Sequence, residues 1–362
     1  MKFIDIFSGI GGFRLGMEMA GHECAGHCEI DKFANRSYMA MYKPREDEWY
    51  AGDIRTVEPW DLPEADCYCG GFPCQAFSIA GKRGGFDDTR GTLFFEIMRI
   101  ARVRKPKYLF LENVKGLFSH DGGRTFGTIL KALWECGYDA EWQVCNSKDF
   151  GVPQNRERVF IIGHLRSGCA RQVFPVRGEN GNIIKQIANL KEKKNRKNPE
   201  AGRVYDARGL SPCITTMSGG GRVPRIVIPV LTPGREEKRQ NGRRFKKAGE
   251  PMYTLTAQDR RGILVNKNGI KRETDCACTL LAASPSRGFG GRDPITMAQD
   301  GAHIRYLTPR ECFRLQGFPD EYFDRAREVN SDNQLYKQAG NSVTVNVIYE
   351  IANKLKLLEE EG

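Results

Sequence analysis

The sequence predicts a doubly wound α/β fold, in which a mostly parallel sheet has helices on both faces and a smaller domain of strands and loops is inserted. Two observations carry this prediction. Short apolar runs alternate with amphipathic stretches over residues 1–165, as expected for strands and helices that succeed one another. From about residue 177 the composition changes to Gly, Lys, Arg and Asn, which marks a boundary.

The expected elements follow from local pattern. Six runs rich in β-branched, aromatic and Cys residues predict strands, and four stretches with apolar residues at helical spacing predict helices between them. A further helix is expected near the C-terminus, with Asn341 and Ser342 as its cap residues. The predicted strands are 2–7, 22–30, 65–71, 108–114, 140–146 and 158–163, and the predicted helices are 13–21, 32–42, 93–104, 126–137 and 341–361.

The change in composition divides the chain into two domains. We expect one domain to consist of residues 1–176 and 334–362, and the inserted domain to consist of residues 177–333. Within the insert, a basic run (191–203) indicates a solvated or nucleic-acid-facing loop. Three Thr-containing segments, each with a Gly/Arg turn, form a weak internal repeat, which predicts short strands followed by basic loops. The alternative is that the glycines only mark the turns of ordinary β-hairpins. These segments are 211–224, 250–264 and 275–291.

The charge of the chain favours a polyanionic partner. A formal net charge of +11 is typical of proteins that bind nucleic acid, although a basic surface can also serve solubility alone. No run reaches the roughly 18 apolar residues of a membrane span, and the N-terminus enters a strand pattern without a signal peptide, so we expect a cytoplasmic protein that does not contact a membrane. The 12 cysteines lack zinc-finger spacing, which predicts reduced thiols and no metal.

The first strand runs into the turn SGIGG, where glycines let backbone N–H groups approach a nucleotide-like ligand. Arg14 stands where the dinucleotide fingerprint requires its third glycine, which argues against an oxidoreductase. Glu29, after the second strand, could accept hydrogen bonds from ribose hydroxyls, and Asp53 could bind an adenine amino group. For each carboxylate, a plain surface position is the alternative.

A reaction site is indicated at three further strand ends. Cys74 lies in GGFPCQAFS after a predicted strand, at the position where open α/β sheets bind their ligands. The alternative is a buried, unreactive thiol, since most cysteines in proteins are of that kind. Glu112 ends the strand YLFLENV, and Arg156 and Arg158 precede another strand in QNRERVF. A thiol, a carboxyl group and guanidinium groups at successive strand ends are typical of a catalytic centre.

The ordered set FSGIGG, EID, GDI, GGFPCQAFS, RGTLFFE, ENV, QNRERVF, RYLTPRECFRLQGFPD and AGNSV resembles the motif series of the DNA (cytosine-5)-methyltransferases of bacterial or phage restriction-modification type. The resemblance covers nearly the whole chain. It departs in residues 177–300, which correspond to the variable target-recognition domain of that family. The resemblance implies the fold of S-adenosylmethionine-dependent methyltransferases, with S-adenosylmethionine as methyl donor.

The resemblance also implies roles for the strand-end residues. Cys74 would add to carbon 6 of a flipped-out cytosine, Glu112 would bind the ring nitrogen and exocyclic amine, and Arg158, with Arg156, would orient the site and stabilise charge. Covalent addition makes carbon 5 nucleophilic enough to accept a methyl group, which is an independent chemical reason for a thiol here. The implied cofactor pocket comprises Phe7, Gly9, Gly11, Glu29, Ile30, Asp53, Ile54, Leu93, Asn341 and Ser342.

Double-stranded DNA is the implied partner, held in a basic cleft between the two domains. The glycine-rich stretch 75–90 is expected to close over it as a mobile loop, and basic side chains of the insert are expected to contact phosphates or guanine edges. We expect a monomer, with any cognate restriction endonuclease acting separately. The residues expected to contact DNA are Gln75, Ser78, Arg90, Arg222, Arg225, Arg260, Arg261, Arg287 and Arg292.

Three alternatives remain. A tRNA cytosine-5 methyltransferase would share the catalytic motifs, but the long basic insert favours a duplex substrate. A DNA-binding regulator that has lost catalysis is disfavoured by the retained Cys74, Glu112 and Arg158. A nicotinamide oxidoreductase is disfavoured by the glycine turn.

Overall fold

The computed structural model describes residues 1–73, 93–166, 172–178, 186–189, 203–206, 210–214, 216, 224–229 and 302–360. The chain forms two compact units. The larger consists of Met1–Gly181 and Cys312–Gly362, and the smaller of Asn182–Glu311. Each is described separately below.

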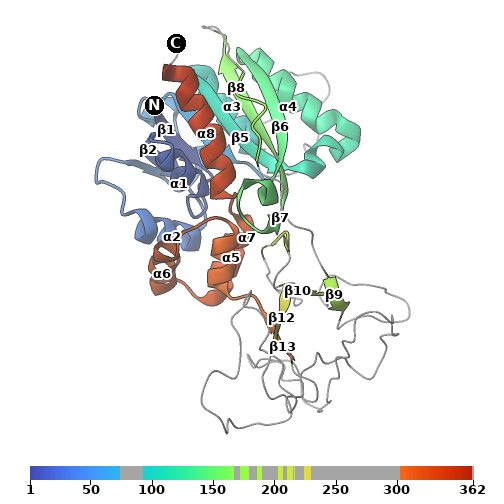
Figure 1. Cartoon of the computed structure of the whole chain (residues 1–362). Helices are drawn as coiled ribbons and strands as arrows, with labels where there is room; N and C mark the ends of the chain where they lie inside the picture. Colours follow the sequence, from blue (N-terminus) through green and yellow to red (C-terminus); the bar gives the residue numbers. More distant parts are fainter. Residues whose placement is uncertain are drawn as a thin grey trace, which may run out of the picture. The chain divides into compact units, whose positions relative to one another are not determined.

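A seven-stranded sheet with the order β3-β2-β1-β4-β5-β8-β6 forms the centre of the larger unit (Figure 1). Neighbouring strands from β3 to β5 run parallel, whereas β8 lies antiparallel to both β5 and β6. The expectation of a mostly parallel sheet is therefore confirmed. The strands are β1 (Lys2–Ile6), β2 (Glu23–Cys28), β3 (Trp49–Ala51), β4 (Cys67–Gly71), β5 (Tyr108–Val114), β6 (Tyr138–Asn146) and β8 (Glu157–Leu165), and the short β7 (Gln154–Asn155) lies outside this sheet.

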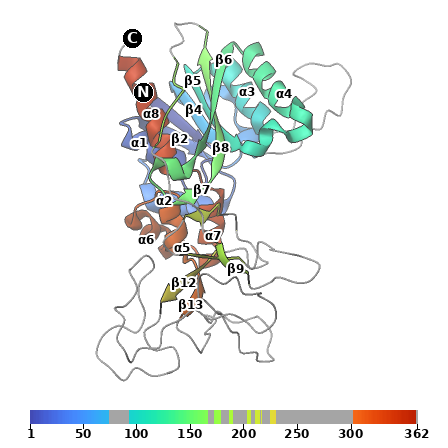
Figure 2. The ribbon, with the colours of Figure 1, turned by 45° about the vertical axis from the view of Figure 1, so that its right-hand side comes forward.

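Helices cover both faces of this sheet, as the doubly wound prediction requires. Consecutive strand residues point to opposite faces, so Phe3 belongs to the apolar cluster under α1 (Gly12–Met19) and α8 (Val345–Glu360). Ile4 belongs to the cluster under α3 (Leu93–Arg104) and α4 (Arg124–Glu135). Figure 2 shows the two helix layers on either side of the sheet.

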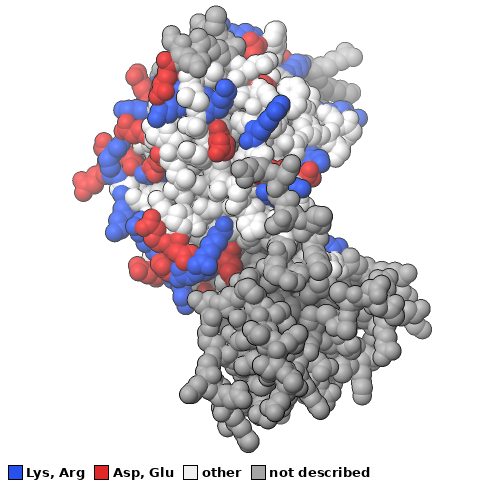
Figure 3. Space-filling model, viewed as in Figure 1, with Lys and Arg blue, Asp and Glu red and all other residues white. Residues whose placement is uncertain are grey.

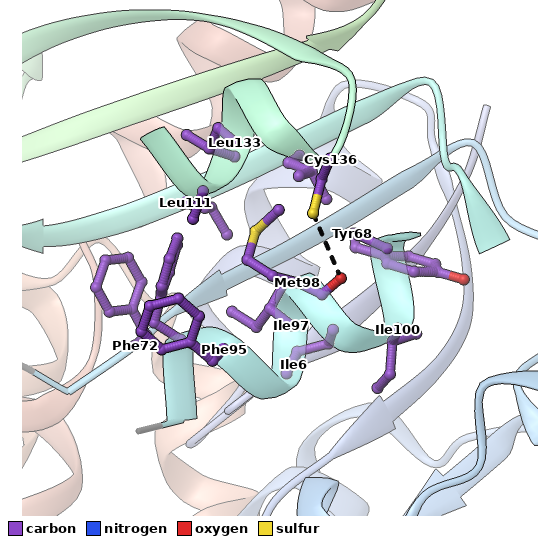
Figure 4. Packing of buried hydrophobic residues seen from close by; sticks show 14 of the residues in the cluster. Ile6, Tyr68, Phe72, Phe95, Ile97, Met98, Ile100, Leu111, Leu133 and Cys136 are labelled. Atoms are coloured by element: carbon purple, nitrogen blue, oxygen red, sulfur yellow. Dashed lines mark hydrogen bonds between the residues drawn. The ribbon is translucent and has the colours of Figure 1, made fainter. Parts of the chain in front are cut away.

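The core under α3 and α4 is continuous from strand to helix. Leu111 of β5 and Tyr68 of β4 pack against Ile97 of α3 in Figure 4. The Cys136 thiol, just after α4, donates to the Met98 carbonyl oxygen at 3.9 Å, so a polar contact joins the C-terminal end of α4 to the middle of α3. This rigid core fixes the strand ends from which the site described below is built.

Three helices that the sequence did not predict complete the larger unit's C-terminal segment: α5 (Pro309–Leu315), α6 (Asp320–Val329) and α7 (Asp332–Asn341). Of these, α6 and α7 pack against α2 (Lys32–Tyr42), whose N-terminus is capped by the Asp31 side chain. Arg325 of α6 donates to the Met41 carbonyl oxygen at 2.7 Å, and Asn330 donates to the Phe33 carbonyl oxygen at 2.8 Å. Because of this packing, residues 312–333 belong to the larger unit rather than to the expected insert, whereas the target-recognition role of the insert stays a prediction.

One predicted helix start is wrong. Asn341 is the last residue of α7 and Ser342 follows it, whereas α8 begins at Val345. The two residues therefore end one helix instead of capping the next, because the chain forms a short turn between α7 and α8.

The described residues of the smaller unit form mainly strands. They are β9 (Gln186–Asn189), β10 (Arg203–Asp206), β11 (Ser211–Pro212), β12 (Arg225–Pro229) and β13 (Ala302–Tyr306), of which four form a sheet in the order β13-β12-β10-β9. In the first repeated segment the described strand is β11, and the segments 250–264 and 275–291 lie outside the described residues.

Short 3-10 helices join several elements of the larger unit: Ile54–Thr56, Pro59–Asp61, Lys115–Phe118, His120–Gly123 and Ser147–Phe150. Among the described helices, none has the length and apolar composition needed to cross a membrane. On the face of the larger unit in Figure 3, acidic and basic side chains are interspersed, so the surplus of positive charge is not gathered there.

Candidate active site

A cavity of about 370 Å³ opens in the larger unit at the carboxyl ends of the parallel strands. This volume lies within the range of small-molecule sites. Its walls come from the turn after β1, the ends of β2, β4 and β5, the start of β8, and the end of α7. The cavity therefore lies at the edge of the sheet where the sequence predicted a site.

Glu112 and Arg158 form an ion pair in the wall of this cavity. The Arg158 Nε lies 3.0 Å from Glu112 Oε1, and both side chains are largely buried. The two residues are close because β5 and β8 pair antiparallel, with Val114 opposite Arg158. Burial raises the pKa of the Glu112 carboxyl group, and the positive charges of Arg158 and Arg156 oppose that rise. A carboxyl group in this environment can hold a proton closer to neutral pH than an exposed one.

Arg156 also lines the cavity but makes different contacts. Its Nη2 donates to the Gly340 carbonyl oxygen at 3.2 Å and to the Ser342 carbonyl oxygen at 2.8 Å. Arg156 therefore contacts the turn after α7, whereas Arg158 contacts the carboxyl group of Glu112.

The end of β4 is held against β5 beside this pair. Asn113 donates from Nδ2 to the Phe72 carbonyl oxygen at 2.9 Å, which fixes the backbone before Pro73. Phe72 and Pro73 line the cavity. Cys74 follows Pro73 in the chain and lies outside the described residues.

The glycine turn after β1 also contributes to the lining of the cavity. Phe7, Gly9 and Gly11 all have positive φ angles, of 58°, 57° and 76°. A side chain at Gly11 would collide with the Tyr42 ring, so both conformation and space require glycine there. Phe7 and Gly9 line the cavity, as the predicted cofactor pocket requires.

Glu29 organises this turn. Its Oε2 accepts from the Gly9 N–H at 2.7 Å, and its Oε1 accepts from the Asp31 N–H at 2.7 Å. Burial raises its pKa, and these backbone donors oppose the rise. Each carboxylate oxygen has a second lone pair, so Glu29 can still accept hydrogen bonds from a ligand.

Four other predicted cofactor residues are absent from the lining of this cavity: Ile30, Asp53, Ile54 and Leu93. Ile30 is 65% exposed, which leaves an apolar surface open beside Glu29, whereas Ile54 is 2% exposed and belongs to the core. Both Asp53 carboxylate oxygens bind the Arg55 guanidinium, which lowers the Asp53 pKa. Leu93 packs against the core at the start of α3.

At the C-terminal end, Asn341 lines the cavity, and the buried Ser342 supports it from behind. Asp31 and Lys337 are among the cavity residues that the sequence analysis did not assign to the site. Asp31 accepts a 2.6 Å hydrogen bond from the Lys337 ammonium group of α7. They are 306 positions apart, so no local pattern could pair them.

Most predicted DNA contacts lie outside the described residues, namely Gln75, Ser78, Arg90, Arg222, Arg260, Arg261, Arg287 and Arg292; of Arg225 only the backbone, in β12, is described. Over the described part of the chain, no group of three His, Cys, Asp or Glu residues is arranged to hold a metal ion.

Comparison with known proteins assigns a family to this arrangement. The family model described as C-5 cytosine-specific DNA methylase matches residues 1–357. The chain is 33% identical to the orphan methyltransferase M.SPRI of Bacillus phage SPR, over 98% of this chain and 97% of that protein. It is 38% identical to the type II methyltransferase M.HpaII of Haemophilus parainfluenzae, over 99% of this chain and 90% of that protein. Among solved structures, the methyltransferase EhMeth of Entamoeba histolytica resembles the fold with a TM-score of 0.59 at 18% identity, over 100% of this chain and 99% of that one.

Proposed function

Since this chain belongs to the C-5 cytosine-specific DNA methylase family, we propose that it transfers a methyl group from S-adenosylmethionine to carbon 5 of cytosine in a short sequence of double-stranded DNA. The names of the relatives, an orphan phage methyltransferase and a type II methyltransferase, support this activity. The observation that carries the proposal is the buried Glu112–Arg158 pair, which shares one cavity with Glu29 and Asn341.

The residues of the cavity fit the proposed cofactor, which supplies an electrophilic methyl group when bound. Glu29 retains lone pairs for ribose hydroxyls, and the exposed Ile30 side chain offers an apolar contact for a flat base. A Cβ added at Gly9 would meet no atom within 4 Å, so the turn leaves open space for a ligand. Asn341 adds an amide to the lining of the same cavity.

The proposed chemistry begins with the Cys74 thiolate. Carbon 5 of cytosine is a poor nucleophile until a thiolate adds to carbon 6, which makes the ring enamine-like. Glu112 hydrogen-bonds the ring nitrogen and shares a proton with it, and Arg158 holds the Glu112 carboxyl group in place. After carbon 5 has received the methyl group, a solvent water molecule takes the carbon 5 proton, and the bond between carbon 6 and the Cys74 sulfur breaks, which restores the aromatic ring and the thiolate.

Because the target carbon is stacked inside a duplex, the base must leave the helix to reach Glu112. We propose that the insert selects the DNA sequence and that the protein acts as a cytoplasmic monomer, independently of any restriction endonuclease. Specific DNA interfaces involve both base and phosphate contacts, which the basic insert can supply.

Bisulfite sequencing tests the proposal directly. The protein is expressed in a host that lacks other cytosine methylation, beside Cys74→Ala and a Cys213→Ala control whose residue does not line the cavity. We expect protected cytosines in one short DNA context with the wild type and the control, and none with Cys74→Ala. Protection that persists in Cys74→Ala would contradict the thiol mechanism, and protection found only in cellular RNA would identify an RNA methyltransferase instead.

A further inference from the structure

A buried hydrogen-bond network surrounds the turn between α7 and α8. Arg156 donates to the carbonyl oxygens of Gly340 and Ser342, as described above. The Gln316 amide nitrogen donates to the carbonyl oxygen of Ala339 at 2.7 Å and to that of Ser342 at 3.3 Å. Two side chains from distant parts of the sequence therefore bind three carbonyl groups of one turn.

The other end of the Gln316 side chain is bound as well. Its Oε1 accepts from Thr344 Oγ1 at 3.0 Å and from Gln154 Nε2 at 3.4 Å. The Gln316 backbone carbonyl accepts from the Val345 N–H at 2.9 Å, at the first residue of α8. Gln316 is fully buried, so it rigidly joins the end of α5, the short β7 and the turn.

The chemistry of a helix end explains why these donors are there. The last carbonyl groups of a helix have no partner within the helix and carry partial negative charge. Arg156 and Gln316 donate to those of Ala339 and Gly340 at the end of α7, and a guanidinium group is favoured at that position. Without these donors the buried carbonyls would lose their hydrogen bonds, and the turn would rearrange.

The same turn forms one wall of the cavity. Gly340 and Asn341 line it, and a Cβ added at Gly12, directly after the glycine turn, would lie 2.8 Å from Ser342 Oγ, so the turn after α7 packs against the glycine turn. Arg156 and Arg158 are two residues apart at the start of β8, yet they bind different structures. One therefore supports the turn, and the other supports the carboxyl group.

We propose that Arg156 and Gln316 are positioning residues for cofactor binding, which hold Gly340 and Asn341 in place, and that Arg158 instead serves the methyl-transfer chemistry through Glu112. This inference rests on the proposed function, because it takes S-adenosylmethionine as the ligand of the turn. It separates two arginines that the sequence motif QNRERVF groups together.

The test measures cofactor binding without DNA. The full-length protein is titrated calorimetrically with S-adenosylmethionine as the wild type and as Arg156→Lys, Gln316→Glu and Arg158→Lys. Gln316→Glu keeps the side-chain shape but removes both donated hydrogen bonds. Loss of a hydrogen bond inside a buried network predicts cofactor affinity weaker by about tenfold or more in the first two variants. Arg158→Lys, the matched control, is expected to bind within about twofold of the wild type.

Kinetics then distinguish positioning from general loss of structure. High cofactor concentrations should restore single-turnover methyl transfer in Arg156→Lys and Gln316→Glu but not in Arg158→Lys. Near-ultraviolet circular dichroism gives the folded fraction to which each affinity is scaled. Unchanged affinity in both Arg156→Lys and Gln316→Glu, or equal weakening in Arg158→Lys, would overturn the inference. A wild type that binds no S-adenosylmethionine would instead reject the proposed function itself.

Discussion

Gly71 leaves the space that the Glu112 carboxyl group occupies. The two residues are register partners on β4 and β5, and a Cβ at Gly71 would lie 2.8 Å from Glu112 Oε2. Gly71→Ala should therefore displace this oxygen and disturb the contact with Arg158. We expect the single-turnover rate of methyl transfer to fall by about tenfold or more, since small misplacements of reacting groups are costly. Rapid-quench kinetics on saturated enzyme would measure this rate.

Cofactor affinity gives the control for this residue. Gly71 lies at the catalytic end of the cavity, so Gly71→Ala should bind S-adenosylmethionine as tightly as the wild type. A variant that transfers methyl groups at the wild-type rate would show that the carboxyl group can move without consequence.

Individual site residues differed in how far the sequence could predict them. Glu112 and Arg158 could be predicted because both lie at strand ends, and strand ends meet at one edge of a sheet. Gln316 and Lys337 could not, because their partners lie hundreds of positions away in the chain or on other elements. For Ile54 the sequence predicted a cofactor contact, and the structure shows its side chain in the core, so that contact stays a prediction.

At the scale of the elements, helix α4 contains Gly127, a glycine that neither the backbone conformation nor the available space requires. A Cβ at Gly127 would meet nothing within 4 Å, and the residue is exposed in the helix interior. Alanine favours a helix over glycine by about 1 kcal/mol, largely because glycine loses more backbone freedom on folding. We expect Gly127→Ala to raise the free energy of unfolding by about that amount. Urea denaturation at neutral pH would test this, and an unchanged or lower midpoint would contradict it.

The same variant separates general helix effects from site effects. Gly127 does not line the cavity, so methyl transfer should be unchanged in Gly127→Ala, in contrast to Gly71→Ala. A parallel loss of activity in both would mean that glycine replacement acts through global structure.

The elements also show where sequence patterns fail. The long central strands and α1 to α4 were predicted, because their burial is periodic and local. β3 has only three residues, so it is too short to show a pattern. The helices α5 to α7 are short or polar, and tertiary contacts such as Arg325 with the Met41 carbonyl hold α6 in place. The contacts of α6 and α7 with α2, which is far away in sequence, could not be seen in the local pattern.

At the scale of the whole molecule, the buried groups Asp5 and His27 make opposite contributions to the change of stability with pH. Burial raises the pKa of Asp5 from 3.8 to about 8, an effect that the Arg14 N–H and guanidinium oppose. Burial lowers the pKa of His27 from 6.5 to about 4. Between about pH 4 and 6.5, folding takes up a proton at Asp5 and releases one at His27, so their contributions offset each other.

Between pH 6.5 and 8, His27 is neutral in both the folded and the unfolded state, so the contribution of Asp5 to the free energy of unfolding is no longer offset. The folded state then holds a proton that the unfolded state lacks, so this contribution to stability is present at low pH and is lost as pH rises towards 8. The slope of the free energy of unfolding against pH is expected to approach about −1.4 kcal/mol per pH unit, because about one proton is released per molecule on unfolding.

Asp5→Asn should remove this slope. The amide resembles the protonated carboxyl group and can still accept from the Arg14 N–H, which lies 3.2 Å from Asp5 Oδ2. We expect the free energy of unfolding of Asp5→Asn to stay nearly level from pH 6.5 to 8, while that of the wild type falls, so the variant gains relative stability as pH rises. Urea denaturation at half-unit steps of pH would measure both curves, with the exposed Asp61→Asn as control. Parallel curves for the wild type and Asp5→Asn would mean that Asp5 is already ionised in the folded protein, and that its charge is compensated within the core beneath the glycine turn.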